Sequence, residues 1–169
     1  PAKKEAHEVG RRDRIDLASE PPKGQMMNAS QQTALAPLVA GGAGYIGSNM
    51  AAMLAAEGHE PVVYDNLSKG HKTAIKGCEF VEGDLADFDM LIATLKINKI
   101  ETVMHFAAFI EAGESVTNPL KYYQNNVSNT QMLLSAMEAT GVGKFVFSST
   151  AAVYGMPDKQ PITEETPEN

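Results

Sequence analysis

The sequence is poor in cysteine, tryptophan and long apolar runs. Its single cysteine, Cys78, cannot form a disulfide within the chain, which excludes a disulfide-stapled secreted scaffold and favours a reducing, cytoplasmic location. The longest apolar stretch, residues 103–110, contains His105 and is far shorter than the roughly 18 residues that a membrane span requires. No N-terminal signal peptide is visible. We therefore expect no association with a membrane.

Basic residues are also scarce, with 14 Lys and Arg against 21 Asp and Glu, for a net charge of −7. This balance argues against nucleic acid or an anionic surface as the main partner, so a phosphate ligand would have to be held by local geometry. The 4 histidines are scattered without the spacing of metal ligands, and we expect no metal site. With 169 residues and 43% hydrophobic content, the chain is long enough for one domain with a core.

The first part of the chain has no apolar periodicity. Residues 1–34 are rich in charged residues, proline, glutamine and serine, which predicts a disordered leader. The cluster Arg11-Arg12-Asp13-Arg14 could be a targeting or nucleic-acid patch, but a solvated tail is the better interpretation. Residues 35–169 are predicted to form the folded domain.

From residue 37 onward, short apolar runs alternate with helical spacing. We expect strands at residues 38–40, 61–64, 79–82, 102–106 and 145–147, and helices at about 45–58, 87–96 and 118–141. Pro37 is tolerated only if it is the first residue of its strand. Short connections between alternating strands and helices predict an α/β fold, a doubly wound parallel sheet covered on both faces.

The predicted helices also have expected core faces. The first would bury Ile46, Met50, Met53 and Leu54. The last would begin at Asn118-Pro119, with the asparagine side chain as cap, and would keep one apolar face formed by Leu120, Tyr123, Val127, Leu134 and Met137.

The glycines between the first strand and the first helix form the motif around which the chain is organised. Gly42, Gly44 and Gly47, preceded by Gly41, fit the pattern G-x-G-x-x-G. The first glycine would allow the turn, the second would let the backbone approach a diphosphate, and the third would let helix and strand pack closely. The N–H groups that begin the helix at Tyr45 would face the anion, which predicts a dinucleotide site.

Residues that directly follow the strands complete this prediction, because ligands of such sheets lie across the carboxyl ends of the strands. Asp65 would accept both hydroxyls of the adenosine ribose and repel a 2′-phosphate, favouring NAD over NADP; a simple turn aspartate is the alternative. Asp84 and Leu85 could bracket the adenine, although an ordinary turn explains them nearly as well. The small residues of Phe106-Ala107-Ala108 would allow close backbone approach.

Three further polar positions lie farther along the chain. Asn125 is either solvated or ties its helix to the strand ends beside the cofactor. His105 is interpreted as a hydrogen-bonded core histidine and not as a general base. Ser148, Ser149 and Thr150 offer hydroxyls where a substrate would arrive, and hydrogen bonding is their expected role because no histidine is spaced to activate them.

A series of motifs resembles one known family. They are residues 41–48 (Gly-Gly-Ala-Gly-Tyr-Ile-Gly-Ser), 64–68 (Tyr-Asp-Asn-Leu-Ser), 82–84 (Glu-Gly-Asp), 105–108 (His-Phe-Ala-Ala), 113–116 (Gly-Glu-Ser-Val), 122–126 (Tyr-Tyr-Gln-Asn-Asn) and 147–155 (Phe-Ser-Ser-Thr-Ala-Ala-Val-Tyr-Gly). From about Leu38 to the last residue, the chain is similar to the extended short-chain dehydrogenases/reductases, and within them to the UDP-glucose 4-epimerases. The resemblance implies a Rossmann-like fold. It adds to the predicted cofactor site Tyr45, Ile46, Asn66, Leu67, Ser68, Lys69, Gly70, Phe109, Ile110 and Thr150.

The resemblance also implies a reaction. In that family NAD takes a hydride from C4 of a UDP-hexose and returns it to the other face of the 4-keto sugar, while a tyrosine followed four residues later by a lysine removes the hydroxyl proton. A residue matching Thr150 hydrogen-bonds the same oxygen. Here no tyrosine has a lysine at that position. We therefore expect the chain to be the N-terminal, cofactor-binding part of such an enzyme, truncated before the last strands and the substrate domain, and inactive alone.

Several alternatives stay open. They are another nucleotide-sugar dehydratase or decarboxylase, a non-catalytic NAD-binding or sensor protein, and a product that does not fold stably. The chain departs from the family pattern at Pro37, Ala40, Asn49 and Ile110. Partners implied by the resemblance are a UDP-sugar and, through the helix around residues 122–137, a second copy of the chain.

Overall fold

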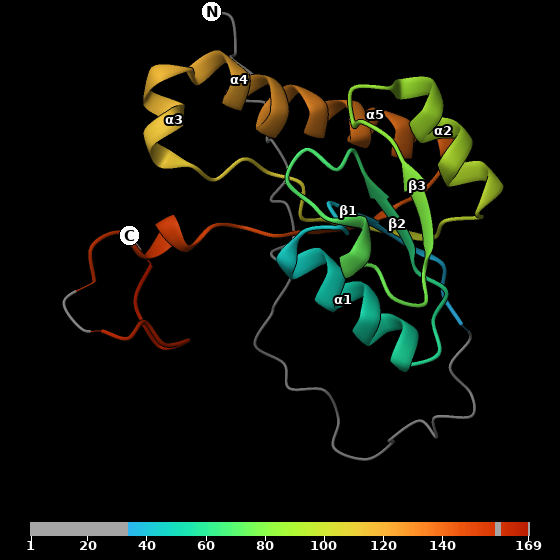
Figure 1. Ribbon diagram of the computed structural model, residues 1–169, viewed down its shortest axis with the longest axis horizontal. Helices are drawn as coiled ribbons and strands as arrows, with labels where there is room; N and C mark the ends of the chain where they lie inside the picture. The colour runs from blue at the N-terminus through green and yellow to red at the C-terminus, as the bar shows by residue number, and fades with distance from the viewer. Residues whose placement is uncertain (1–33, 158–159, 169) are drawn as a thin grey trace, which may run out of the picture. The chain divides into compact units, whose positions relative to one another are not determined.

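A five-stranded sheet forms the centre of the molecule (Figure 1). The computed structural model describes residues 34–157 and 160–168, so nearly all of the predicted leader lies outside the described residues. The strands are β1 (Pro37–Ala40), β2 (Val62–Asp65), β3 (Glu79–Glu82), β4 (Thr102–His105) and β5 (Lys144–Phe147). All neighbours pair in parallel, in the order β3-β2-β1-β4-β5. The predicted α/β doubly wound sheet is confirmed.

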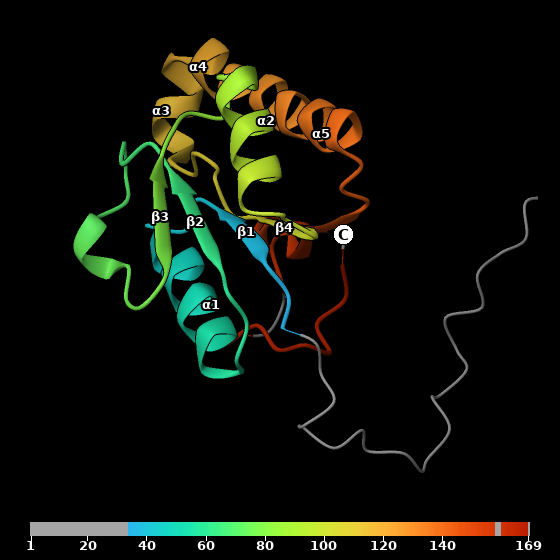
Figure 2. The same cartoon turned by 90° about the vertical axis from the view of Figure 1, so that its right-hand side faces the viewer.

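Helices cover both faces of this sheet. They are α1 (Tyr45–Ala56), α2 (Phe88–Ile97), α3 (Ala112–Thr117), α4 (Pro119–Tyr123) and α5 (Asn129–Thr140), with 3-10 turns η2 (Lys72–Ala74) and η4 (Ala151–Tyr154) and a π turn η3 (Gln124–Ser128). Figure 2 shows α1 on one face and α2 with α5 on the other. In residues 34–157 and 160–168, no helix is long and apolar enough to cross a membrane.

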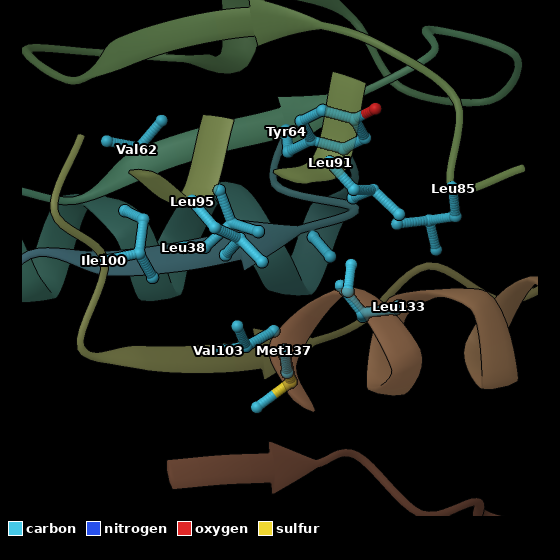
Figure 3. Packing of buried hydrophobic residues seen from close by; sticks show 12 residues of the cluster. Leu38, Val62, Tyr64, Leu85, Leu91, Leu95, Ile100, Val103, Leu133 and Met137 are labelled. Atoms are coloured by element: carbon cyan, nitrogen blue, oxygen red, sulfur yellow. The ribbon is translucent and has the colours of Figure 1, made fainter. Parts of the chain in front are cut away.

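The main core lies between the sheet and the pair α2 and α5 (Figure 3). Leu91 and Leu95 of α2 and Leu133 of α5 are buried against Leu38 of β1. Truncating one such leucine to alanine typically costs about 2–5 kcal/mol. A smaller cluster on the opposite face, around Val39, joins α1 to the sheet. Because successive residues of β1 point to opposite faces, both layers are anchored on the same short strand.

Pro37 begins β1, as predicted, and pairs in register with Thr102 of β4. At the first position of a strand the missing N–H removes little from the ladder. The pairing of β1 with β4 therefore continues to Ala40, directly before the glycine loop.

The predicted core face of the first helix was only partly correct: Leu54 packs against the smaller cluster, but other predicted positions do not. Ile46 and Met53 are 58% and 64% exposed, whereas Gly47 and Ala51 are buried. The helix approaches the sheet so closely that only small side chains fit beneath it.

The predicted face of the last helix was also wrong, with one exception. Of the predicted positions only Met137 is buried, and Leu120, Tyr123, Val127 and Leu134 are exposed. The inward face is formed instead by Tyr122, Leu133, Ala136 and Met137.

The predicted long helix is divided. The π turn η3 separates α4 from α5, and the short α3, which no apolar spacing indicated, precedes them. Asn118 stands before α4, but its side chain accepts no capping hydrogen bond.

Candidate cofactor-binding site

A cleft that is partly open to solvent lies at the carboxyl ends of β1, β2, β3 and β4. Most of the predicted site residues line it together: Gly41, Gly44, Asp65, Asn66, Ser68, Lys69, Gly70, Asp84, Leu85, Phe106, Ala107, Ala108, Phe109 and Asn125. The strand ends thus converge where the topology expects a ligand.

The remaining predicted residues do not line the cleft: Gly42, Tyr45, Ile46, Gly47, Leu67, Ile110 and Thr150. Gly42 is buried in the glycine loop and Gly47 on the inner side of α1, whereas Tyr45 and Ile46 are exposed on the first turn of α1. Thr150 is exposed, and its hydroxyl accepts a hydrogen bond from the N–H of Ala152 (3.2 Å) at the start of η4. The structure therefore does not bring Thr150 to the cofactor residues.

The structure changes the role predicted for the first glycine of the pattern and keeps that of the third. The residue in the left-handed conformation is Gly41 (φ +76°), not Gly42, and a Cβ on Gly41 would lie 2.6 Å from the nitrogen of Ala107. A Cβ on Gly42 would lie 2.8 Å from the Val39 oxygen. A Cβ on Gly47 would collide with the Gly41 oxygen, so the third glycine lets α1 pack on the turn, as predicted.

The N-terminus of α1 faces this turn. Gly44 is its N-cap and offers no side-chain acceptor, and the N–H of Ser48 donates back to the Gly44 oxygen (3.0 Å). The N–H groups of the first turn before Ser48 have no acceptor within the helix. An anion placed there would meet these donors and the positive end of the helix dipole.

Asp65 is a buried carboxylate at the end of β2. Its Oδ2 accepts from the N–H of Ala43 (3.0 Å) and its Oδ1 from the N–H of Leu67 (2.8 Å). A carboxylate has about four acceptor positions, so two remain for other donors. The carboxylate is therefore fixed beside the glycine loop and can still bind a pair of hydroxyl groups.

Asp84 is connected to the loop after β2. Its Oδ2 accepts from Nδ2 of Asn66 (2.7 Å), and its Oδ1 accepts from the N–H of Ala86 (2.8 Å). Tyr64, which sequence reasoning missed as a lining residue, donates its hydroxyl hydrogen to the backbone carbonyl oxygen of Asp84 (2.9 Å). Burial, followed by the charges of Asp87 and Asp84, raises the pKa of Tyr64 to about 12, so this tyrosine remains a donor.

Asn126 is a residue that the sequence analysis missed. Its Oδ1 accepts from the N–H of Phe109 and its Nδ2 donates to the Phe109 oxygen, both at 2.9 Å. The role of tying the helix to the strand ends, considered for Asn125, thus belongs to Asn126, while Asn125 lines the cleft and donates to Asn126 (2.8 Å). The adjacent asparagines in the 122–126 motif were the only signal.

Glu111 was also missed. Its Oε1 lies 2.7 Å from Nζ of Lys69, and this hydrogen-bonded ammonium lowers the pKa of Glu111 to about 2. A second ion pair joins Lys121 to Glu114 (2.6 Å) within the α3 and α4 segment. Nothing in the spacing of Lys69 and Glu111 indicated that they meet.

His105 is a core histidine, as predicted. Its Nδ1 accepts from the N–H of Ala107 (3.4 Å), and its Nε2 lies 2.9 Å from the Thr130 hydroxyl. That hydroxyl itself donates to the backbone carbonyl oxygen of Asn126. This network assigns the ring proton to Nε2. Burial lowers the pKa of His105. In the part of the chain that the structure describes, no group of three His, Cys, Asp or Glu residues could hold a metal.

Comparisons with known proteins agree with this geometry. A model of the NAD dependent epimerase/dehydratase family matches residues 37–169. The chain is 52% identical over 127 residues to a UDP-glucose 4-epimerase of Rhizobium meliloti, covering 75% of this chain and 39% of that protein. The chain thus spans about two fifths of the length of the curated relatives it matches.

Solved structures give the same result. The UDP-glucose 4-epimerase of Brucella ovis in complex with NAD has a TM-score of 0.72 and 48% identity, covering 80% of this chain and 42% of that one. The Bifidobacterium longum UDP-glucose 4-epimerase in complex with NAD+ and UDP has a TM-score of 0.71 and 37% identity, covering 79% and 42%.

Proposed function

The chain belongs to the NAD dependent epimerase/dehydratase family, and we propose that it is the cofactor-binding part of a UDP-glucose 4-epimerase. The complete enzyme would interconvert UDP-glucose and UDP-galactose through a 4-keto sugar. The observation that carries this proposal is the buried Asp65 carboxylate, fixed beside a glycine loop whose helix N-terminus lacks acceptors.

The residues of the cleft fit NAD chemically. The free acceptor positions of Asp65 would bind the adenosine ribose hydroxyls, and its charge would repel a 2′-phosphate. The N–H groups at the start of α1, including those of Tyr45 and Ile46, would bind the diphosphate. Asp84 and Leu85 would contact the adenine, and Phe109 and Asn125 would lie toward the nicotinamide. Bound there, NAD would exchange a hydride with C4 of the sugar.

The roles of the remaining predicted residues are also proposals. The loop residues Ser68, Lys69 and Gly70 would close over the adenosine half, and Thr150 would hydrogen-bond the reacting sugar hydroxyl. Tyr45, Tyr64, Tyr122, Tyr123 and Tyr154 are followed at the fourth position by Asn49, Ser68, Asn126, Val127 and Asp158. Because the proton-removing Tyr-Lys pair is missing from these positions, we expect no turnover from this chain alone.

The absence of a lysine four residues after any tyrosine of this chain favours a second candidate, a non-catalytic NAD-binding protein. It would bind NAD with the same residues and would show no epimerase activity even with every segment of its natural protein present. The gene would decide between the two, because an epimerase requires a Tyr-x-x-x-Lys pair encoded in the same reading frame. The relatives named as epimerases favour the first candidate.

A homodimer through α4 and α5 is the partner we propose besides a UDP-sugar. Leu120, Tyr123, Val127 and Leu134 expose apolar surface there. Burying such side chains against a second copy would remove them from water. Sedimentation should show a dimer that Leu120→Gln weakens; a monomer at micromolar concentration would contradict this.

We also propose a cytoplasmic location, with residues 1–34 as a leader and residues 35–169 as the cofactor domain.

Calorimetry with NAD and the full 169-residue chain tests the proposal. We expect binding that Asp65→Asn weakens by about 10-fold or more, because hydrogen bonds to a charged group contribute about 1.5–3 kcal/mol. The asparagine keeps the shape but loses the charge. NADP should bind the parent chain much more weakly than NAD. Absence of NAD binding by a chain that melts cooperatively would refute the proposed function.

A further inference from the structure

Lys69 and Glu111 belong to loops on opposite sides of β1. Lys69 follows β2 and Glu111 follows β4, and these two strands are the neighbours of β1 in the sheet. The Lys69 Nζ and the Glu111 Oε1 lie 2.7 Å apart. The ion pair therefore crosses the end of β1, where the glycine loop lies.

The pair lies on the solvent side of the cleft. Lys69 lines the cleft, and the side chains of Lys69 and Glu111 are 56% and 43% exposed. The loop that carries Lys69 rests on the glycine loop, since the N–H of His71 donates to the Ala43 oxygen (3.0 Å). A Cβ on Gly70 would lie 2.7 Å from the Ala43 Cβ. The lysine thus extends from the cleft, past the glycine loop, to a glutamate of the loop that follows β4.

Glu111 is the anchored partner. Its Oε2 accepts from the N–H of Ile110 (3.3 Å) and lies 3.3 Å from the Tyr122 hydroxyl, whose single proton it shares with the closer Oε2 of Glu114 (2.9 Å). Tyr122 is buried in α4, so Glu111 is held against the helical layer. Lys69 has no comparable second contact among the described residues, and it is the partner that can swing away.

We propose that Lys69 and Glu111 form a clasp across the cofactor cleft that slows the release of bound NAD. The inference rests on the proposed function, because it requires NAD to lie across the strand ends. A ligand bound along β2, β1 and β4 must pass this bridge when it leaves. Because both side chains are exposed, the ion pair contributes little free energy, and we expect only a modest change in the rate of NAD release.

The opposite role for Lys69 would be direct binding of the diphosphate. The two roles predict changes of opposite sign for Glu111→Gln. If Lys69 acts as part of the clasp, this substitution opens the cleft and accelerates release. If Lys69 acts as a phosphate ligand, the substitution frees the ammonium from Glu111, strengthens the attraction and slows release.

The experiment measures release from the full 169-residue chain. NADH, whose fluorescence reports binding, is loaded and then displaced by excess NAD in a stopped-flow instrument. For Glu111→Gln we expect release about two- to fivefold faster, as an exposed ion pair allows. The difference should vanish at about 1 M salt, where the Debye length is about 3 Å. The exchanged pair Lys69→Glu with Glu111→Lys should restore slow release.

Glu138→Gln is the matched control. It makes the same substitution on the exposed surface of α5, where Glu138 takes part in neither of the ion pairs found among the described residues. Its release rate should equal that of the parent chain, and equal thermal melts would establish that both variants are folded. Unchanged or slower release from Glu111→Gln overturns the clasp while NAD binding stands. A parent chain that binds no NADH overturns the proposed function, and the clasp with it.

Discussion

The two sides of the cleft differ in how completely their strands are covered. In the central strands β1 and β2 every residue is buried, and Asp65 is fixed by two backbone donors, although the edge strand β3 beside them is nearly as open as β5. On the far side, β5 leaves Val146 and Phe147 46% and 58% exposed, and Thr150 lies outside the cleft. Strands with neighbours on both edges and helices on both faces position their loops firmly. The glycine loop and Asp65 of the proposed cofactor site thus lie on or directly after the well-covered strands β1 and β2, whereas Thr150, proposed to contact the sugar, follows the poorly covered β5.

The largest effect should come from Gly47→Val, which attacks the well-covered side. Its Cβ would collide with the Gly41 oxygen, so α1 must move away from the turn. Overpacking of this kind costs about 1–3 kcal/mol of unfolding free energy. We also expect NAD affinity to fall about tenfold or more, since the first-turn donors move with the helix.

Gly113→Ala is the control for this change, because a Cβ at Gly113 meets nothing within 4 Å. Urea denaturation and calorimetry would compare the two variants. Equal behaviour of both would mean that the close packing at Gly47 does not position the binding side.

Asn126→Ala is the next largest change. It removes the two hydrogen bonds that connect η3 to Phe109 in the loop after β4, a connection that we call the joint. The substitution would leave the N–H and oxygen of Phe109 without their partner, and we expect a loss of about 1–2 kcal/mol in unfolding free energy. Asn125→Ala keeps that joint and should change stability by less than about 0.5 kcal/mol while still weakening NAD binding. Chemical denaturation and calorimetry on both variants would separate the roles. A larger stability loss for Asn125→Ala would reverse our assignment.

Acidification should weaken the same joint, because His105 is linked to Asn126 through the Thr130 hydroxyl. Burial lowers its pKa below the usual 6.5, so the unfolded chain binds the proton more readily than the folded chain. The contribution of His105 to the unfolding free energy is therefore greatest above pH 6.5. It falls as the pH drops below 6.5, by at most about 1.4 kcal/mol per pH unit. Protonation would also place an N–H on Nδ1 against the N–H of Ala107.

His105→Gln is the comparison, because a glutamine amide can still donate to Thr130 but does not titrate. Denaturation at about pH 7.5 and about pH 5.5 should show a greater loss of unfolding free energy in the parent chain than in the variant, by at most about 1.4 kcal/mol. Identical losses would mean that His105 is not the titrating group.

The smallest effect should come from Thr150→Ala. Thr150 is exposed and does not line the cleft, so NAD affinity of this chain should change by less than about twofold, within the roughly ±0.5 kcal/mol typical of surface substitutions. Calorimetry beside the parent chain would measure it. A tenfold loss would mean that the far side already takes part in cofactor binding, and would remove the contrast between the two sides.

Features with a local cause could be predicted from the sequence. Strand positions were correct to about one residue because each short apolar run ends at glycine or a polar loop, and Pro37 has one tolerable place. Asp65 reaches the cleft because chain direction alone brings it to the carboxyl edge of the sheet.

The helix faces could not be predicted in the same way. Apolar spacing does not say which of two possible stripes faces the sheet, and in α1 the packing distance selects the small residues Gly47 and Ala51 over Ile46 and Met53. Glu111 and Asn126 were missed for another reason. Their partners, Lys69 and Phe109, are fixed only when separate loops meet in space.

The π turn η3 gives the helical layer a sensitivity to length. A π turn carries about one residue more than an α-helical turn, and each residue added to a helix rotates the rest of that helix by about 100°. Residues 124–128 therefore set the phase between α4, which buries Tyr122, and α5, which buries Leu133 and Met137. Deleting one residue here would hardly shorten the helix, yet it would rotate one of the two inward faces out of the core. Insertions or deletions in this segment should therefore be poorly tolerated even where they spare Asn125 and Asn126.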